Sequence, residues 1–238
     1  MAGALPRGGA RTRLVAGIAV AYVAAWVIGI GFGYGLKGTH WWDQGAPWEY
    51  AVLRAFHQTT PDWFDLAMRG SVYLGTNLVV LPVMLAFGLW LWRVKHAPLV
   101  ALHLLTVCIG ALSMNGAMKW LLSRDRPTIF PQRGLYAWAS FPSGHLILTT
   151  SLYFTAAMML WRWRGWRWPF VGASFMVLIT SYSRLYLSVH WPTDIIGGVL
   201  IGVVWLIGSW MAFTSFDARR RARRALSLPQ ESVARRLG

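Results

Sequence analysis

The chain has 238 residues, of which 56% are hydrophobic, and its 23 Lys and Arg against eight Asp and Glu give a formal net charge of +15. This composition is too apolar for an ordinary soluble domain and is typical of an integral membrane protein. The basic residues follow a membrane-topology pattern, described below, so the charge does not indicate nucleic-acid binding.

Long apolar stretches predict an all-α integral membrane protein with six transmembrane helices in one bundle. Each stretch has about the 20 residues that a helix needs to cross a hydrocarbon core of about 30 Å. The domain would cover residues 14–213, between a basic N-terminus (1–13) and an Arg-rich tail (214–238). The expected spans, in chain order, are 14–36, 71–92, 97–122, 144–161, 169–189 and 193–213.

The first apolar stretch resembles a signal peptide, with Arg residues before it and a small-residue Ala19-Val20-Ala21 site within it. The apolar run continues past that site to Leu36, so we expect an uncleaved anchor. The single cysteine, Cys108, falls inside the third span and is expected to be a small apolar filler.

Segment 39–70 follows the first span. Trp48, Val52 and Phe56 recur in it at helical spacing, and Pro61-Asp62 suits the start of a second helix. This pattern predicts an amphipathic helical segment that lies in the membrane interface. The segment could be a lid packed on the spans or a wall of a lipid entrance.

Basic residues are distributed unevenly between the two sides of this bundle. Of the 23 Lys and Arg, 15 fall on the side that holds both termini, whereas eight fall on the opposite side with six of the eight acidic residues. By the positive-inside rule both termini are cytoplasmic, and segment 39–70 is periplasmic. We therefore expect a multi-pass protein of the cell (inner) membrane, with a tail that touches anionic lipid.

Polar residues gather where the third span ends and the fourth begins. Lys119 lies near the outer end of the third span, and Arg126 is expected on the loop beyond it, because the residue before a proline disfavours helix. The stretch FPSGH then opens the fourth span. Ser143 suits an N-cap, and Gly144 lets an anion approach the free backbone N–H groups of the helix start.

A second polar group lies where the fifth span ends. Arg184 and His190 are placed on the outer turns of that span. Pro192 suits the first position of the sixth helix, so Asp194 would lie in its first turn, four residues after His190. A lone Arg would snorkel to lipid phosphates, but charges that can face one another at this depth indicate a function.

This combination of residues suggests phosphoryl transfer. Cations and helix-start amides would spread positive potential over phosphate oxygens. His190 would be the nucleophile as a neutral imidazole, and Asp194 would hold the N–H of its other nitrogen. His145 would serve as general acid and then as general base. The phosphate-binding groups would be Lys119, Arg126, Ser143, Gly144 and Arg184.

Three motifs carry a family resemblance: Lys119-(six residues)-Arg126-Pro127, Pro142-Ser143-Gly144-His145, and Ser183-Arg184-(five residues)-His190-(three residues)-Asp194. In this order and spacing they resemble the tripartite signature of the type-2 phosphatidic acid phosphatase family, which shares its site with vanadium haloperoxidases. The resemblance implies a metal-independent lipid phosphatase that works through a phosphohistidine, with the roles just given and with His145 also in the phosphate site.

No His, Cys or carboxylate cluster has metal-ligand spacing, so neither a catalytic metal nor another cofactor is expected. A non-catalytic lipid-phosphate carrier or sensor would need the cations but neither histidine, and a haloperoxidase would not need six spans. The substrate is expected to be a lipid phosphate or pyrophosphate, with undecaprenyl pyrophosphate favoured over phosphatidylglycerol phosphate, phosphatidic acid or a lipid A phosphate. The sequence does not indicate an oligomeric state.

Overall fold

A computed structural model describes residues 9–57, 60–133 and 138–226 of the chain. Within these ranges every regular element is helical, which confirms the prediction of an all-α fold. The elements are α1 (Gly9–Lys37), α2 (Trp41–Gln44), α3 (Pro47–Phe56), α4 (Asp62–Ser71), the 3₁₀ helix η1 (Val72–Gly75), α5 (Asn77–Arg93), α6 (Pro98–Leu122), α7 (Gly144–Arg164), α8 (Trp168–Tyr186) and α9 (Pro192–Leu226).

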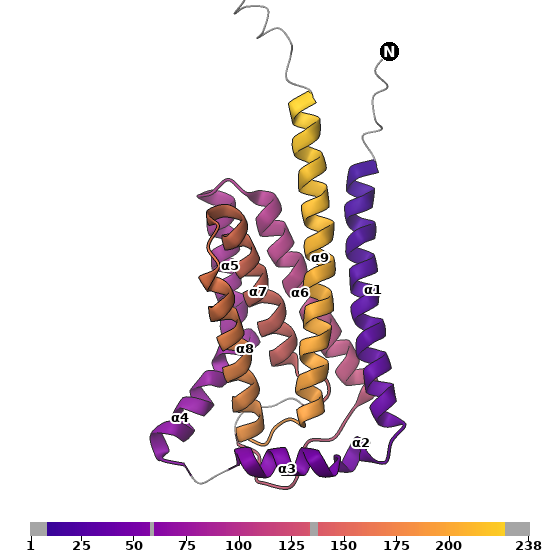
Figure 1. The fold of residues 1–238 in the computed structure, drawn as a ribbon, viewed down its shortest axis with the longest axis vertical. Coiled ribbons are helices and arrows are strands. Elements are labelled where there is room, and N and C mark those ends of the chain that lie inside the picture. The colour runs from indigo at the N-terminus through magenta and orange to yellow at the C-terminus, as the bar shows by residue number, and fades with distance from the viewer. Residues whose placement is uncertain (1–8, 58–59, 134–137, 227–238) are drawn as a thin grey trace, which may run out of the picture.

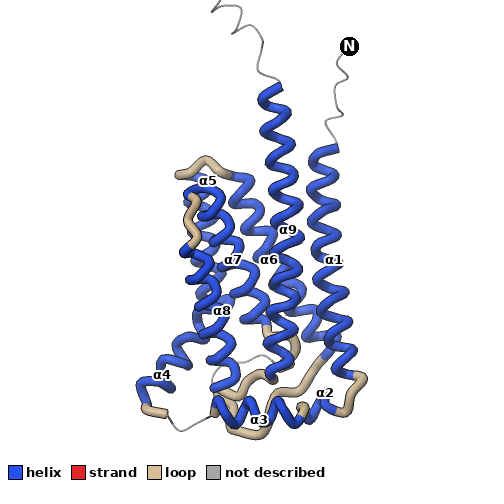
Figure 2. Tube along the Cα trace, in the orientation of Figure 1, coloured by secondary structure: helices blue, strands red, loops and turns tan. Residues whose placement is uncertain are grey.

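The long helices run alongside one another as a bundle. In the described ranges α1, α5, α6, α7, α8 and α9 each have 17 or more residues, and α2, α3 and α4 lie near one end of the bundle (Figure 1). Helix α7 contacts α6, α8 and α9, and α1 packs along α9. The described loops lie towards the two ends of the bundle (Figure 2).

Small residues let α1 and α9 approach closely. A Cβ atom added to Gly17 would lie 2.9 Å from the Cβ of Ala212, and one added to Gly208 would lie 2.5 Å from the Cβ of Ala21. Such contacts are typical of helices that associate in a membrane, where close packing replaces hydrophobic burial as the driving force.

Three described helices are long and apolar enough to cross a membrane: α1, α6 and the Pro192–Ala222 part of α9. The apolar part of α5 is shorter, and α7 carries hydroxyl groups along its buried face. Three of these, on Thr149, Ser151 and Thr155, donate to backbone carbonyls one turn earlier. Because α7 packs against neighbouring helices, it can carry such groups away from lipid, and the six-span layout stays a prediction.

Several helix bounds differ from those expected. The stretch predicted as a span from residue 71 is interrupted at Thr76, whose extended backbone separates η1 from α5. Helix α9 continues past residue 213 and includes the Arg-rich segment up to Leu226. The placement of His190 on a helical turn is wrong: α8 ends at Tyr186, and Ser188, with a φ of 54°, turns the chain into a loop before α9.

Candidate active site

The three motifs meet at the end of the bundle where α2, α3 and α4 lie (Figure 1). The C-terminal ends of α6 and α8 and the N-terminal ends of α7 and α9 all reach this end of the bundle. The Ser143 N–H donates to the Asp194 carbonyl oxygen at 3.1 Å, which ties the start of α7 to the start of α9. Antiparallel packing therefore brings together residues that are up to 75 positions apart in the motifs.

His190 and Asp194 form the expected pair. Asp194 lies in the first turn of α9, and its Oδ2 atom is 3.4 Å from Nδ1 of His190. The same oxygen accepts the Trp191 backbone N–H at 2.8 Å, so the carboxylate is oriented from two directions. A proton on Nδ1 would be held by Asp194, which leaves Nε2 with the lone pair that a nucleophile needs.

His190 lies outside the helices and is surrounded by positive charge. Burial and the nearby cations, Arg126 first among them, lower the pKa of His190 well below its ordinary value, although a hydrogen bond with the Ser140 backbone opposes the shift. Both main causes disfavour a second proton on the ring. The imidazole is therefore neutral at physiological pH, as nucleophilic attack requires.

His145 lies in the first turn of α7, near enough to Arg184 to interact with its charge. Its Nε2 atom is buried and has no hydrogen-bond partner among the described residues. A Cβ atom on Gly75 would come within 3.1 Å of the ring, so η1 covers it closely. A buried ring nitrogen without a partner is placed to exchange a proton with a ligand.

Two buried cations, Lys119 and Arg126, donate to backbone carbonyls. Lys119 Nζ donates to the carbonyl oxygens of Ala139 (2.6 Å) and Ser140 (3.1 Å). The Arg126 guanidinium donates to Ala139, at 2.9 Å, and to the Val189 carbonyl. Lys119 and Arg126 are 7% and 8% exposed, so both charged groups are largely desolvated.

Arg184 is 1% exposed, and its Nη2 atom donates to the neutral Ser183 hydroxyl at 3.1 Å. Its Nε atom has no hydrogen-bond partner among the described residues. Across the described ranges neither Arg184 nor Lys119 forms an ion pair with a carboxylate. Burying a charge without an opposite charge is costly, so these cations favour an anionic ligand.

The start of α7 differs in part from the expectation. Ser143 is the N-cap residue, but its hydroxyl forms no capping bond and has no other partner among the described residues. Its N–H is not free, because it donates to Asp194. Gly144 has a packing reason as well: a Cβ atom there would lie 2.5 Å from Oδ1 of Asn115. The Ser143 hydroxyl and the Gly144 amide remain as donors for an anion.

Arg124 was missed by the sequence reasoning, which placed it in the loop without a role. Its Nη1 atom donates to Oδ1 of Asp194 at 2.7 Å and to Oγ1 of Thr193 at 2.6 Å. The guanidinium lies over the rings of Trp42 and Trp191, each with its centroid 5.3 Å away. Arg124 therefore fixes the carboxylate oxygen that His190 does not contact.

Glu49 of α3 was missed as well. Its Oε1 atom accepts from the N–H (3.1 Å) and the hydroxyl (2.6 Å) of Thr193, and its Oε2 atom lies 3.4 Å from Nη2 of Arg124. Farther along, Asp65 of α4 accepts from the Tyr186 hydroxyl at 3.2 Å. These contacts hold the α2–α4 segment against the bundle, as the lid interpretation expects. Only the spacing of Arg124, two residues before Arg126, offered any signal in the sequence.

No group of three or more His, Cys, Asp or Glu side chains with the geometry of a metal site occurs within the described ranges. The donors that surround His190 are instead cationic and hydroxyl groups. Their chemistry suits a phosphate rather than a metal ion.

Comparison with known proteins gives a match to the model of the PAP2 superfamily over residues 99–217. An Escherichia coli (strain K12) protein, provisionally named an undecaprenyl-diphosphatase, is 30% identical over 61% of this chain and 73% of its own length. An undecaprenyl-diphosphatase of Sulfolobus acidocaldarius is 31% identical over 51% of this chain and 56% of its own. Phosphatidylglycerophosphatase B of Bacillus subtilis is 26% identical over 65% of this chain and 77% of its own length.

The fold also matches a solved structure. The crystal structure of a transmembrane PAP2-type phosphatidylglycerolphosphate phosphatase from Bacillus subtilis superposes with a TM-score of 0.68 and 21% identity, and the match covers 83% of this chain and 96% of the other. This likeness shows that the helical bundle is shared.

Proposed function

Because the chain belongs to the PAP2 superfamily and is a membrane lipid phosphatase, we propose that it cleaves a phosphomonoester or pyrophosphate of a lipid through a phosphohistidine on His190. The observation that carries the proposal is the set of buried cations around a neutral histidine that has its own orienting carboxylate. A buried positive site of this kind suits the charge that develops on phosphate oxygens in the transition state.

In the first step Nε2 of His190 attacks phosphorus, and the bond from phosphorus to the leaving oxygen breaks. His145, protonated while the dianionic phosphate is bound, gives its proton to that oxygen. Asp194 holds the Nδ1 proton and balances the charge on the phosphorylated ring. Lys119, Arg126, Arg184, the Ser143 hydroxyl and the Gly144 amide hold the phosphate oxygens.

In the second step His145 takes a proton from water, and the resulting hydroxide attacks phosphorus. The bond from phosphorus to His190 breaks, which restores the imidazole and releases inorganic phosphate. Each step is a phosphoryl transfer with one proton moved, so the proposed cycle needs no redox cofactor and no metal.

Undecaprenyl pyrophosphate is the substrate we favour, because two of the similar proteins are named for that activity at 30% and 31% identity. Phosphatidylglycerol phosphate is the second candidate, supported by the relative that is 26% identical. Phosphatidic acid is the third. A carrier that binds lipid phosphate without hydrolysis is disfavoured, since it would need neither the His190–Asp194 pair nor His145.

The experiment is phosphate release by the full-length protein in detergent, with excess chelator, from a panel of undecaprenyl pyrophosphate, phosphatidylglycerol phosphate and phosphatidic acid. We expect turnover with chelator, inhibition by vanadate, and the highest kcat/KM for the pyrophosphate. Loss of activity with chelator and its full return with one divalent ion would refute the histidine mechanism. A preference for phosphatidylglycerol phosphate would change only the substrate.

A further inference from the structure

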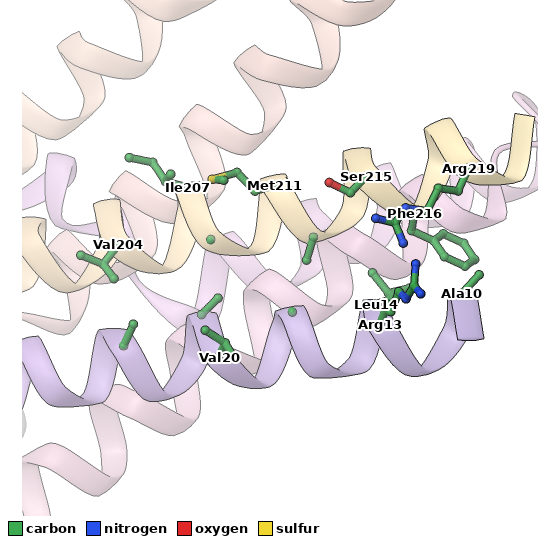
Figure 3. A pocket seen from close by; sticks show the side chains of 15 residues that line it. Ala10, Arg13, Leu14, Val20, Val204, Ile207, Met211, Ser215, Phe216 and Arg219 are labelled. Atoms are coloured by element: carbon green, nitrogen blue, oxygen red, sulfur yellow. The ribbon is translucent and has the colours of Figure 1, made fainter. Parts of the chain in front are cut away.

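A groove lies between α1 and α9 at the end of the bundle opposite His190. It encloses about 570 Å³ and runs from Ala10 to Ala24 on α1, facing the stretch from Val204 to Arg219 on α9. Figure 3 shows this α1–α9 groove from close by. None of its lining residues belongs to the proposed active site.

The wall of the groove is apolar and faces outward. Val20 on α1 and Ile207 and Met211 on α9 are 68%, 47% and 62% exposed, although all three are hydrophobic. The close contact of Gly17 with Ala212 brings the helices together there, so larger side chains on either side stand apart and leave a channel. In a membrane this channel would open to lipid chains.

The mouth of the groove is positive. Arg13 on α1 and Arg219 on α9 extend their guanidinium groups toward one another (Figure 3). Neither forms an ion pair within the described ranges, and Asp217, the acidic residue nearest to Arg219 in sequence, pairs with other arginines. That residue, Asp217, pairs with Arg162 at 2.8 Å and with Arg221 at 3.1 Å.

Two guanidinium groups that converge, with no carboxylate paired to either among the described residues, repel each other. An anion between them would attract both. An apolar channel continues directly from this point. A ligand that satisfies both parts has an anionic head and a hydrocarbon chain. Basic pockets between transmembrane helices on the cytoplasmic side are known to bind the head groups of anionic lipids.

We propose that the α1–α9 groove binds one anionic phospholipid, with its phosphodiester between Arg13 and Arg219 and one acyl chain along Val20, Ile207 and Met211. From Ala10 to Ala24 the groove follows 14 residue-to-residue steps of helix, about 21 Å at a rise of 1.5 Å per residue. This exceeds half of a hydrocarbon core of about 30 Å, so an acyl chain from one leaflet fits along it. A zwitterionic lipid carries its own cation, which would compete with the arginines.

The test uses the full-length protein in phosphatidylcholine vesicles that contain phosphatidylglycerol with a photoreactive diazirine in its acyl chain. Phosphatidylglycerol is a phosphodiester, so it offers no terminal phosphate for the active site to remove. Chymotryptic peptides are mapped by mass spectrometry, because replacing Arg removes tryptic sites. We expect labels on α1 and α9 around Val20 and Met211, and at least a tenfold loss of these labels in the double variant Arg13→Gln/Arg219→Gln.

The matched control is Arg11→Gln/Arg220→Gln, which removes the same charge from the same two helices. Arg11 does not line the groove, and Arg220 lines a separate cavity beside Arg162 and Asp217. The control should keep the labels, and phosphate release by both double variants should show that they are folded. The proposal is overturned if diazirine phosphatidylcholine labels the groove equally, if both double variants lose the labels alike, or if the wild type carries no label there.

Discussion

Arg124 holds Asp194 with a hydrogen bond of 2.7 Å in which both side chains are at most 1% exposed. The carboxylate that orients His190 is therefore itself oriented from the opposite side. Glu49, 3.4 Å from the Arg124 guanidinium, adds a second negative charge to this buried group. One arginine thus lies between two carboxylates, and it links the α2–α4 segment to the start of α9.

Removal of Arg124 should harm both stability and catalysis. Arg124→Gln leaves two buried carboxylates without their cation, which costs about 3–5 kcal/mol of unfolding free energy. It also frees Asp194 to turn away from His190, so we expect kcat/KM to fall by a further amount on the order of 1.5–3 kcal/mol. Thermal unfolding in detergent and phosphate release measure the two effects.

The matched control for Arg124 is Arg133→Gln. Arg133 lies on the same loop and pairs with Asp65 at 3.1 Å, but its side chain is 35% exposed. An exposed pair of this kind contributes about 0–1 kcal/mol, so this variant should stay near the wild type. If Arg124→Gln lowered the unfolding temperature but kept the full kcat/KM at a temperature where the protein stays folded, Arg124 would contribute to stability alone.

Variants of the two histidines should differ in how their activity depends on the leaving group of the substrate. His190→Ala should abolish turnover whatever the leaving group, because no acceptor for the phosphoryl group remains. His145→Ala should cost about 10²–10⁴ in kcat with a lipid monoester, whose leaving oxygen needs a proton, and much less with an activated nitrophenyl ester. Acid-labile phosphate should accumulate on the protein without His145 and never on the protein without His190. A label on His145 itself would reverse the two roles.

The pH dependence follows from the lowered pKa of His190. In the proposed mechanism the neutral ring is the active form. A lowered pKa keeps the ring neutral to lower pH, so the acid limb of kcat/KM should lie below the ordinary histidine value of about 6.5. Arg126→Gln removes the cation that lowers the pKa of His190 most, so the limb should move to higher pH, apart from any loss in rate. Arg54→Gln removes an exposed charge of α3 and should leave the limb in place. A limb that does not move in Arg126→Gln would exclude His190 as the titrating group.

The orientation predicted from charge can be read with single cysteines, because the native Cys108 is buried. Thr128 lies exposed in the loop after α6, and Lys95 lies exposed between α5 and α6 at the other end of the bundle. An impermeant thiol reagent added to intact cells should label Thr128→Cys and should label Lys95→Cys only after lysis. The reverse pattern would place the active site in the cytoplasm.

Parts of the local structure around the polar motifs could be predicted from the sequence, whereas the roles of the motif residues stay predictions. Ser143 as N-cap and Asp194 in the first turn of a helix that begins at Pro192 follow from local rules of helix capping, and both are found. Local rules failed for His190, because the chain turns at Ser188 with a positive φ, and Ser188 is neither a proline nor a glycine that would have marked a turn in the sequence.

The Glu49–Arg124–Asp194 group could not be predicted, since its members are 70 or more positions apart and their pairing depends on how α3 lies under the bundle. The same holds for Ser143. The sequence suggested that its N–H is free, whereas in the structure this N–H donates to the Asp194 carbonyl at the start of α9. Long-range pairing of this kind follows only from the packed fold.

Lys119 and Arg184 are buried and form no ion pair with a carboxylate of the described ranges, which bears on turnover in the proposed mechanism. Inorganic phosphate, the last product, carries all of the charge that these cations attract and lacks only the lipid. It should therefore compete with incoming substrate and slow each cycle at its final step. The cations bind the phosphate and not the lipid tail. The tail should nevertheless help new substrate to displace the bound inorganic phosphate, because it concentrates the substrate in the membrane beside the site.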